Sequence, residues 1–169
     1  MGYYMTVNED KNIKKMVAGD IDEVCKIWLI NSSIAHGFIP AGFWCSLLPE
    51  IKQKWETNLS NNNYEMYVYK EESAAIKGFI VICKQSNYVE ELFVSPQYQG
   101  HDIGSKLLEE MKKGKDFLEI TVYQLNTGAI IFYTKEGFEI KKGKNSVYIE
   151  EKTGQWKLRM RWEKDNVKR

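Results

Sequence analysis

Hydrophobic and polar positions follow two different spacings along this chain, and the spacing changes near residue 66. Before that point, apolar residues recur every three or four positions, which is the spacing of one face of an α-helix. The first such run is Ile21, Val24, Ile27 and Trp28. Asp20 directly precedes this run and an acidic residue follows three positions later, so the pattern predicts a helix that starts at Asp20.

A second helical run carries the apolar residues Phe43, Trp44, Leu47, Leu48 and Ile51. Pro49 lies in the middle of this run. Because proline has no N–H to donate to the preceding turn, we expect the helix to be kinked or divided there.

From residue 66 the apolar residues alternate with polar ones or form continuous β-rich runs at residues 66–69, 76–83 and 88–94. Short polar segments separate the runs, which predicts an antiparallel meander. A helix from Ile103, a strand over residues 117–123 and a helix ending at Gly137 are expected next. A strand, helix and strand in this order require one parallel strand pair.

The C-terminal part of the chain has the pattern of a long hairpin. Its first strand covers residues 138–141, and in its second strand Trp156, Leu158, Met160 and Trp162 alternate with basic residues. The segment between them, residues 142–155, is polar, and we expect a mobile loop there.

Composition supports one globular domain and excludes several classes of protein. The 169 residues are 43% hydrophobic and 28% charged, without repeats or linkers, so we expect a single domain over residues 1–169 with a flexible extension at residues 1–11. The net charge of +1 gives no general attraction to nucleic acid or to an anionic membrane. The longest apolar run, residues 79–83, is far below the ~20 residues that cross a bilayer. We therefore expect a cytoplasmic protein with no nucleic-acid partner and no membrane partner.

The three cysteines are far apart and lie in no paired motif, which disfavours both a disulfide framework and a metal site. The most informative segment is residues 92–108, where a strand runs into a glycine-bearing turn and then an amphipathic helix. The unpaired N–H groups at a helix N-terminus bind phosphate, and Gly100 and Gly104 lack a Cβ that would hinder approach. Glycines in such turns also occur for turn geometry alone, so the local pattern leaves both explanations open.

Two motifs add to this pattern. The stretch QGHDIG at residues 99–104, after LFVSP at 92–96, resembles the acetyl-CoA loop of the GNAT superfamily of N-acetyltransferases. The stretch NTGAIIFYTKEGF at residues 126–138 resembles the second motif of the same family, in the same order and at normal spacing. Ile27 with Trp28, AHGFIP at 35–40, and Phe43 with Trp44 are similar to a bacterial branch that contains protein-lysine acetyltransferases.

The resemblance implies an α/β (α+β) fold with a mixed, mostly antiparallel central sheet of six to seven strands. Helices would cover both faces of this sheet, and the one parallel strand pair would lie at the cofactor site. The implied cosubstrate is acetyl-CoA, without a metal, and the implied acceptor is an amine, either a protein lysine or N-terminus or a small amine such as a polyamine, amino sugar or drug. A non-catalytic acyl-CoA sensor is the alternative from a different class, and both a monomer and a homodimer remain possible.

The resemblance also implies roles for individual residues. Tyr133 matches the general acid that protonates the coenzyme sulfur, and Asn126 matches a residue that contacts the pantetheine arm. Without the resemblance, Tyr133 has the pattern of a core aromatic and Asn126 that of a helix cap. A bulge in the strand before the loop would free backbone groups for the cofactor. The expected cofactor contacts are Leu92, Phe93, Val94, Gln99, Gly100, His101, Asp102, Ile103, Gly104, Ser105, Asn126 and Phe132.

A lysine-like amine has an ordinary pKa near 10.4 and needs a base before it attacks a thioester. Glu91, beside the reacting strand, is the first candidate, and Glu90 is the second. Strand alternation places them on opposite faces, so at least one should be a solvated surface charge. Trp28, His36 and Phe38 are expected on the acceptor side, where His36 could also relay protons.

Asp102 stands where the family has glycine, and it puts a carboxylate near the expected pyrophosphate. Coenzyme affinity would fall only if this side chain points inward. The alternative is that Asp102 faces solvent or caps the following helix, because aspartate is a favoured N-cap residue.

Overall fold

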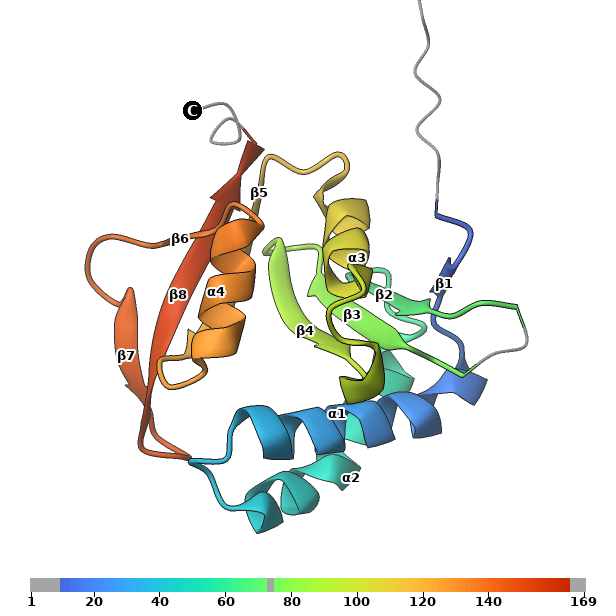
Figure 1. Cartoon of the computed structure of the whole chain (residues 1–169), viewed down its shortest axis with the longest axis horizontal. Helices are drawn as coiled ribbons and strands as arrows, with labels where there is room; N and C mark the ends of the chain where they lie inside the picture. The colour runs from blue at the N-terminus through green and yellow to red at the C-terminus, as the bar shows by residue number, and fades with distance from the viewer. Residues whose placement is uncertain (1–9, 73–74, 165–169) are drawn as a thin grey trace, which may run out of the picture.

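The computed structural model describes residues 10–72 and 75–164 and contains one eight-stranded sheet with helices on both faces (Figure 1). In chain order the elements are β1 (Ile13–Lys15), η1 (Ala18–Asp20), α1 (Ile21–Ala35), α2 (Ala41–Asn58), β2 (Tyr64–Tyr69), β3 (Gly78–Cys83), β4 (Tyr88–Val94), η2 (Pro96–Tyr98), α3 (Ile103–Lys112), β5 (Phe117–Tyr123), α4 (Thr127–Lys135), β6 (Glu139–Ile140), β7 (Val147–Glu150) and β8 (Gln155–Glu163). Residues 1–9 of the expected N-terminal extension lie outside the described residues.

The strand order is β1-β2-β3-β4-β5-β8-β6, and β7 also pairs with β8. The pair β4–β5 is parallel and the other pairs are antiparallel. This arrangement confirms the predicted mixed, mostly antiparallel sheet, the meander and the parallel pair. The sheet has more strands than the expected six to seven, because the loop predicted at residues 142–155 contains β7. That strand forms its own hairpin with β8, so the interpretation of the whole segment as a loop was wrong.

The two N-terminal helices follow the apolar pattern closely. Helix α1 begins after Asp20 as predicted, but the Asp20 carboxylate accepts a hydrogen bond from the Val17 N–H at 2.9 Å and does not cap α1. Helix α2 runs unbroken from Ala41 to Asn58, so Pro49 does not divide it.

The sheet separates two hydrophobic cores, one against α1 and α2 and the other against α3 and α4 (Figure 1). The first core contains Val24, Trp28, Trp44, Trp55, Phe79 and Val81. The second core contains Ile80, Val89, Leu107, Leu118, Tyr133 and Met160. Because neighbouring residues of β3 enter opposite cores, the sheet is buried on both faces at its centre, and β3 reads as a continuous apolar run in the sequence.

No helix in the described part of the chain is long and apolar enough to cross a membrane. Cys25, Cys45 and Cys83 are all free thiols. Over residues 10–72 and 75–164, no group of three or more histidine, cysteine or acidic side chains is placed to hold a metal ion.

Candidate active site

Strands β4 and β5 touch at one end and then diverge. Their parallel pairing consists of Tyr88 with Glu119, and beyond it a pocket of about 300 Å³ opens between the strands. The pocket is lined by β4, β5, α1, α2, α4 and the β7–β8 hairpin. Seven of the predicted site residues line it: Trp28, His36, Glu91, Leu92, Phe93, Asn126 and Tyr133. The structure thus brings together residues that are up to about a hundred positions apart in the sequence.

A β-bulge in β4 changes the direction of two acidic side chains. Val81 of β3 pairs with Glu91, but the next residue, Ile82, pairs with Val89, so Glu90 is an extra residue on β4. Val89 and Leu92 both pack into the core against α3 and α4. In a regular strand, two residues three positions apart lie on opposite faces. The bulge therefore places Val89 and Leu92 on the same face.

The consequence of the bulge is that Glu90 and Glu91 both lie toward α1 and α2, where Glu90 pairs with Lys54 and Glu91 accepts a hydrogen bond from Trp28. The expectation that alternation places them on opposite faces was therefore wrong. A bulge in this strand was expected from the resemblance, and it lies at Glu90, before the segment Leu92, Phe93 and Val94.

The two carboxylates have different surroundings. Glu90 forms an ion pair with Lys54 of α2, with 2.7 Å between Nζ and Oε2. Burial raises the pKa of Glu91 to about 8, although Lys54 and a hydrogen bond from the Trp28 side chain act in the opposite direction. The Glu91 carboxyl group therefore gains and loses its proton close to neutral pH, as general bases do.

Tyr133 belongs both to the core and to the pocket. Its side chain is 4% exposed, and its ring lies 5.0 Å from Phe132 and 5.3 Å from Phe138, centroid to centroid. Burial raises the pKa of the Tyr133 phenol, with smaller contributions from Glu91 and Tyr88. The phenol therefore stays protonated at neutral pH, as a proton donor must.

Asn126 is held by two contacts. Its Oδ1 accepts a hydrogen bond from the Ala129 N–H at 3.1 Å, so the helix-cap interpretation is confirmed. This contact identifies the other side-chain atom as Nδ2, which lies 3.2 Å from Nε2 of His36. Nε2 of His36 is therefore the acceptor in this pair, and one hydrogen of Nδ2 remains for a ligand.

His36 is 8% exposed and lies among aromatic rings, 4.9 Å from Tyr123 and 5.1 Å from Trp44. Burial lowers its pKa to about 4, with a further contribution from Lys157, so the imidazole is neutral at physiological pH. Phe38 does not line the pocket. It packs behind the pocket wall, with its ring 5.8 Å from that of His36.

The glycine-bearing loop between β4 and α3 adopts left-handed backbone conformations at two positions. Gly100 has φ 79° and Asp102 has φ 57°. Asp102 is the N-cap residue of α3, but its exposed side chain makes no capping hydrogen bond, so it faces solvent. A glycine at this position would avoid the steric cost that Asp102 has at positive φ.

Several loop side chains are already engaged with the protein. The Gln99 side-chain amide donates to Asn31 Oδ1 at 3.0 Å and to the Val94 carbonyl at 3.1 Å, which ties the loop to α1. Ser105 donates to Glu136 at 2.5 Å. Gly104 is buried, and a Cβ there would lie 3.2 Å from the Phe132 ring, so this glycine allows α3 and α4 to approach each other. Backbone groups of the loop, and not these side chains, are left to contact a ligand.

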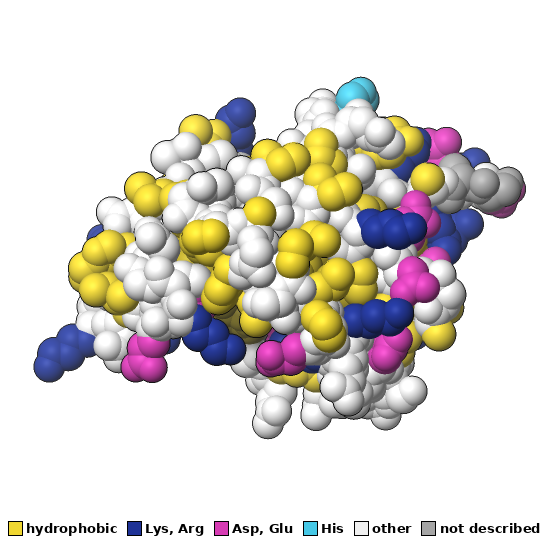
Figure 2. All heavy atoms as spheres, turned by 90° about the horizontal axis from the view of Figure 1, so that it is seen from below, with side chains coloured by type: hydrophobic (Ala, Val, Ile, Leu, Met, Phe, Trp, Pro, Cys, Tyr) yellow, Lys and Arg dark blue, Asp and Glu magenta, His cyan; other side chains and the backbone are white. Residues whose placement is uncertain are grey.

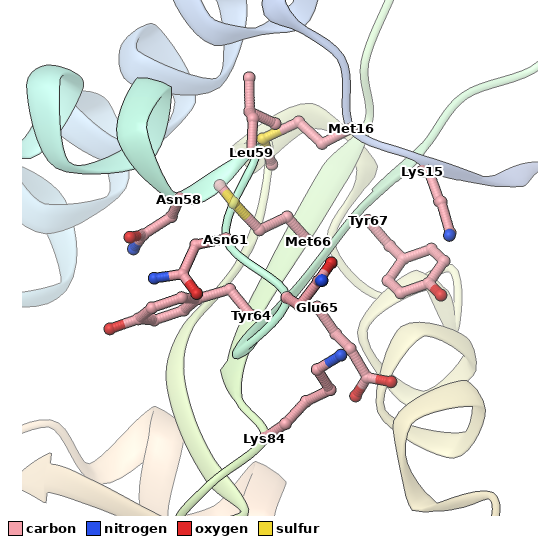
Figure 3. Close-up of a pocket in the computed structure, with 11 residues that line it drawn as sticks. Lys15, Met16, Asn58, Leu59, Asn61, Tyr64, Glu65, Met66, Tyr67 and Lys84 are labelled. Carbon is pink, nitrogen blue, oxygen red and sulfur yellow. The ribbon is translucent and has the colours of Figure 1, made fainter.

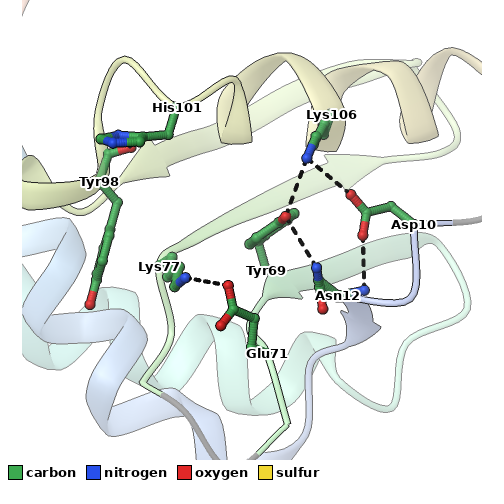
Figure 4. Close-up of polar contacts among 8 residues, drawn as sticks. All are labelled: Asp10, Asn12, Tyr69, Glu71, Lys77, Tyr98, His101 and Lys106. Atoms are coloured by element: carbon green, nitrogen blue, oxygen red, sulfur yellow. Dashed lines mark hydrogen bonds and ion pairs between the residues drawn. The ribbon is translucent and has the colours of Figure 1, made fainter.

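The cations around the loop have partners of their own (Figure 4). Lys106 lies 3.5 Å from Asp10, and Lys77 lies 2.5 Å from Glu71. His101 is exposed, and its Nδ1 lies 3.0 Å from the Gln99 carbonyl. An anion at the loop would therefore depend mainly on the first N–H groups of α3, which have no helical partner.

The loop and the pocket lie at the same end of the sheet. Residues 99–105 do not line the pocket, but they follow directly after β4, whose Leu92 and Phe93 do. Because β4 and β5 are parallel and each precedes a helix, the N-termini of α3 and α4 both flank the opening (Figure 1). One extended ligand can thus contact the loop with one end and the pocket with the other.

A second hollow, of about 200 Å³, lies beside β2 near the end of α2 (Figure 3). Its lining is mainly polar and includes Lys15, Asn58, Asn61, Tyr64 and Lys84. None of the residues predicted from sequence for the site lines it, so we place the candidate active site at the opening between β4 and β5.

Sequence reasoning missed most of the residues that line the pocket, and four missed residues bear on its charge. Lys54 reaches Glu90 from α2, and Tyr123, Glu150 and Lys157 form one wall of the pocket. Glu150 lies in β7, inside the segment that was expected to be a loop, so its approach to Tyr123 had no signal in the sequence.

Comparisons with known proteins agree with this geometry. Residues 62–140 match a family model described as Acetyltransferase (GNAT) domain. The peptidyl-lysine N-acetyltransferase YiaC of Escherichia coli (strain K12) is 27% identical over 128 residues, which cover 76% of this chain and 83% of YiaC.

The fold is similar to that of many solved structures, including one from Thermoplasma acidophilum and one from Vibrio cholerae. The PaiA N-acetyltransferase of Thermoplasma acidophilum, in complex with coenzyme A, has a TM-score of 0.73 and 22% identity, with 89% of this chain and 97% of PaiA covered. The spermidine N-acetyltransferase of Vibrio cholerae, in complex with CoA and spermine, has a TM-score of 0.67 and 13% identity. The match covers 91% of this chain and 95% of the Vibrio cholerae chain.

Proposed function

Because this chain belongs to the GNAT superfamily of N-acetyltransferases, we propose that it transfers an acetyl group from acetyl-CoA directly to a primary amine. One observation carries the proposal: Glu91 and Tyr133, from a strand and a helix, line the same pocket at the opening between β4 and β5. A group suited to accept a proton and a group suited to donate one thus lie in one pocket.

The residues present fit acetyl-CoA as cosubstrate. The loop before α3 offers backbone N–H groups at a helix N-terminus for the pyrophosphate, and Gly100 has open space where a Cβ would stand. Asn126 keeps one amide hydrogen for the pantetheine arm, and the backbone of Leu92, Phe93 and Val94 borders the opening. When bound, acetyl-CoA would supply the acetyl group as a thioester.

The chain's own residues would then move three protons. Glu91 takes a proton from the acceptor ammonium, which leaves a neutral amine to attack the thioester carbon. A backbone N–H of β4 stabilises the carbonyl oxygen as it becomes negative. When the carbon–sulfur bond breaks, the Tyr133 phenol gives its proton to the sulfur. The nitrogen that attacked passes its remaining extra proton to the resulting phenolate, and the products are an amide and free coenzyme A.

For the acceptor, we propose a lysine side chain or N-terminus of a protein, as in the bacterial branch that contains protein-lysine acetyltransferases. Two observations support this choice: the 27% identity to a peptidyl-lysine N-acetyltransferase and the aromatic wall of the pocket, where Trp28, His36 and Trp44 meet. Small amines with the same reacting group are the alternative within this chemistry.

The variant Tyr133→Phe tests the proposal, because it removes the proton donor and keeps the ring in the core. We expect kcat to fall by about 10²-fold or more, while coenzyme A binding, measured by calorimetry, changes less than threefold. Native mass spectrometry with acetyl-CoA and a panel of amines and peptides would identify the acetylated product. Coenzyme binding without turnover of any amine in the parent protein would instead indicate an acyl-CoA sensor.

A further inference from the structure

Three carboxylates line the pocket among the described residues, and two of them already have a cation. Glu90 pairs with Lys54 at 2.7 Å, and Glu150 pairs with Lys157 at 2.7 Å. Within residues 10–72 and 75–164, Glu91 makes no ion pair. The pocket therefore has one carboxylate that can receive an incoming ammonium group.

Glu150 already has three donors within the protein. Besides Lys157, it accepts hydrogen bonds from the Tyr123 hydroxyl at 2.5 Å and from Thr153 Oγ1 at 2.8 Å. An ammonium group that approached Glu150 would therefore compete with these three donors. It would also meet Lys152, which lines the pocket, is exposed and has no ion pair in the described part of the chain.

The part of the pocket lining that α2 contributes is apolar. Phe43, Leu47 and Ile51 recur every four residues on one face of α2, and each is only partly buried. Lys54 follows three residues later on the same face, which explains how it reaches Glu90. Figure 2 shows this end of the molecule, with hydrophobic side chains gathered across the middle of the face.

From these observations we infer that the site selects an acceptor with a single amine flanked by apolar groups, and that it disfavours polyamines. This inference rests on the proposed function. Glu91 accepts the proton of the reacting amine. A second ammonium group in the pocket would lose hydration and find no unpaired carboxylate to contact. Apolar neighbours of the amine would instead bury surface against Phe43, Leu47 and Ile51, at roughly 25 cal/mol per Å².

Two acceptors test the inference in the full chain. One is a blocked peptide with a single lysine between two leucines, and the other is spermidine. We expect kcat/KM for the peptide to exceed that for spermidine by at least tenfold. Calorimetry on the protein loaded with coenzyme A should give a lower Kd for the peptide than for spermidine. Equal or better use and binding of spermidine would overturn the inference.

The variant Lys54→Met tests the mechanism of selection. It frees Glu90 to bind an ammonium group, so the ratio of spermidine to peptide kcat/KM should rise at least fivefold. Lys52→Met is the matched control, because Lys52 lies on the same helix but pairs with Asp22 at 2.6 Å, outside the pocket. We expect no change of the ratio in this control. An unchanged ratio in a folded Lys54→Met protein would contradict the assignment.

Failure of the proposed function gives a different result. If neither acceptor is acetylated at any concentration, the proposed acetyl-transfer function is wrong. The two calorimetric Kd values still decide the inference in that case, because they require no turnover.

Discussion

His36 and Asn126 link α1 to α4 through one hydrogen bond, with 3.2 Å between Nε2 and Nδ2. The two helices cover opposite faces of the sheet, so this contact bridges the open end between β4 and β5. It also holds the first turn of α4 in place. Tyr133 lies on the same helix, two turns further along.

Replacing His36 should separate hydrogen bonding from ring packing. His36→Gln keeps an oxygen that can accept from Asn126, whereas His36→Leu leaves Nδ2 of Asn126 unpaired. We expect His36→Leu to weaken coenzyme A binding about tenfold, and His36→Gln to weaken it less than threefold, both measured by calorimetry. Equal losses in the two variants would show that the ring, and not its acceptor nitrogen, is what matters.

Glu91 should control the activity of the protein near pH 8. In the parent, kcat/KM is expected to rise as the Glu91 carboxyl loses its proton, with an apparent pKa near 8. In Glu91→Gln this limb should disappear, kcat should fall by about 10²-fold, and only the ionisation of the amine itself should remain. A pH profile of Glu91→Gln with the limb intact would assign the base to another group or to water.

The same group should make stability depend on pH. The folded pKa of Glu91, about 8, is above its ordinary 4.5, so between these values the folded state holds a proton that the unfolded state lacks. The free energy of unfolding of the parent should therefore fall relative to Glu91→Gln by up to about 1.4 kcal/mol per pH unit in this window. Urea unfolding of both proteins at pH 5 and pH 8 measures the difference. The titration of His36 is common to both and cancels; a difference that does not change with pH would contradict the burial of Glu91.

Asp102 should have little effect on coenzyme binding through its charge, because its side chain is exposed and faces solvent. We expect Asp102→Asn to change the Kd for coenzyme A less than about twofold at low salt, measured by calorimetry. A gain of about threefold or more that shrinks at high salt would instead show that the carboxylate lies near the bound phosphates. Asparagine tolerates positive φ, so tighter binding by Asp102→Gly alone would point to backbone strain as the cause.

Gln99 should position the loop rather than contact the ligand through its side chain. Gln99→Ala leaves Oδ1 of Asn31 without its donor, and Asn31 is 5% exposed. We expect a loss of about 1–2 kcal/mol in the free energy of unfolding, together with a severalfold weaker Kd for coenzyme A. Gln97→Ala is the control, because Gln97 is exposed and lies two residues away in the same loop. Equal effects of the two substitutions would argue against the tie between the loop and α1.

Sequence reasoning located the elements that carry strong local signals. The strands at residues 88–94 and 117–123 have the predicted bounds, and α3 begins at Ile103 as expected. In these segments the apolar spacing, the glycine turn and the position of the charges all favour the same structure.

The features that were missed depend on partners distant in the sequence. The bulge at Glu90 results from the register between β3 and β4, and nothing in the order of residues 88–94 distinguishes it from a regular strand. Strand β7 is four residues long in a polar segment, and its pairing with β8 defines it. Lys54 belongs to the site only because the bulge turns Glu90 toward α2.

The narrow contact between β4 and β5 has a consequence for measurement. The sheet consists of two halves joined at Tyr88 and Glu119, where the Glu119 amide donates to the Asn87 carbonyl at 2.9 Å. Any change in the width of the opening must pivot near this bond. The exchange rate of that single amide proton with solvent is therefore a built-in reporter of how far the two halves separate, and a ligand that holds them together should slow it.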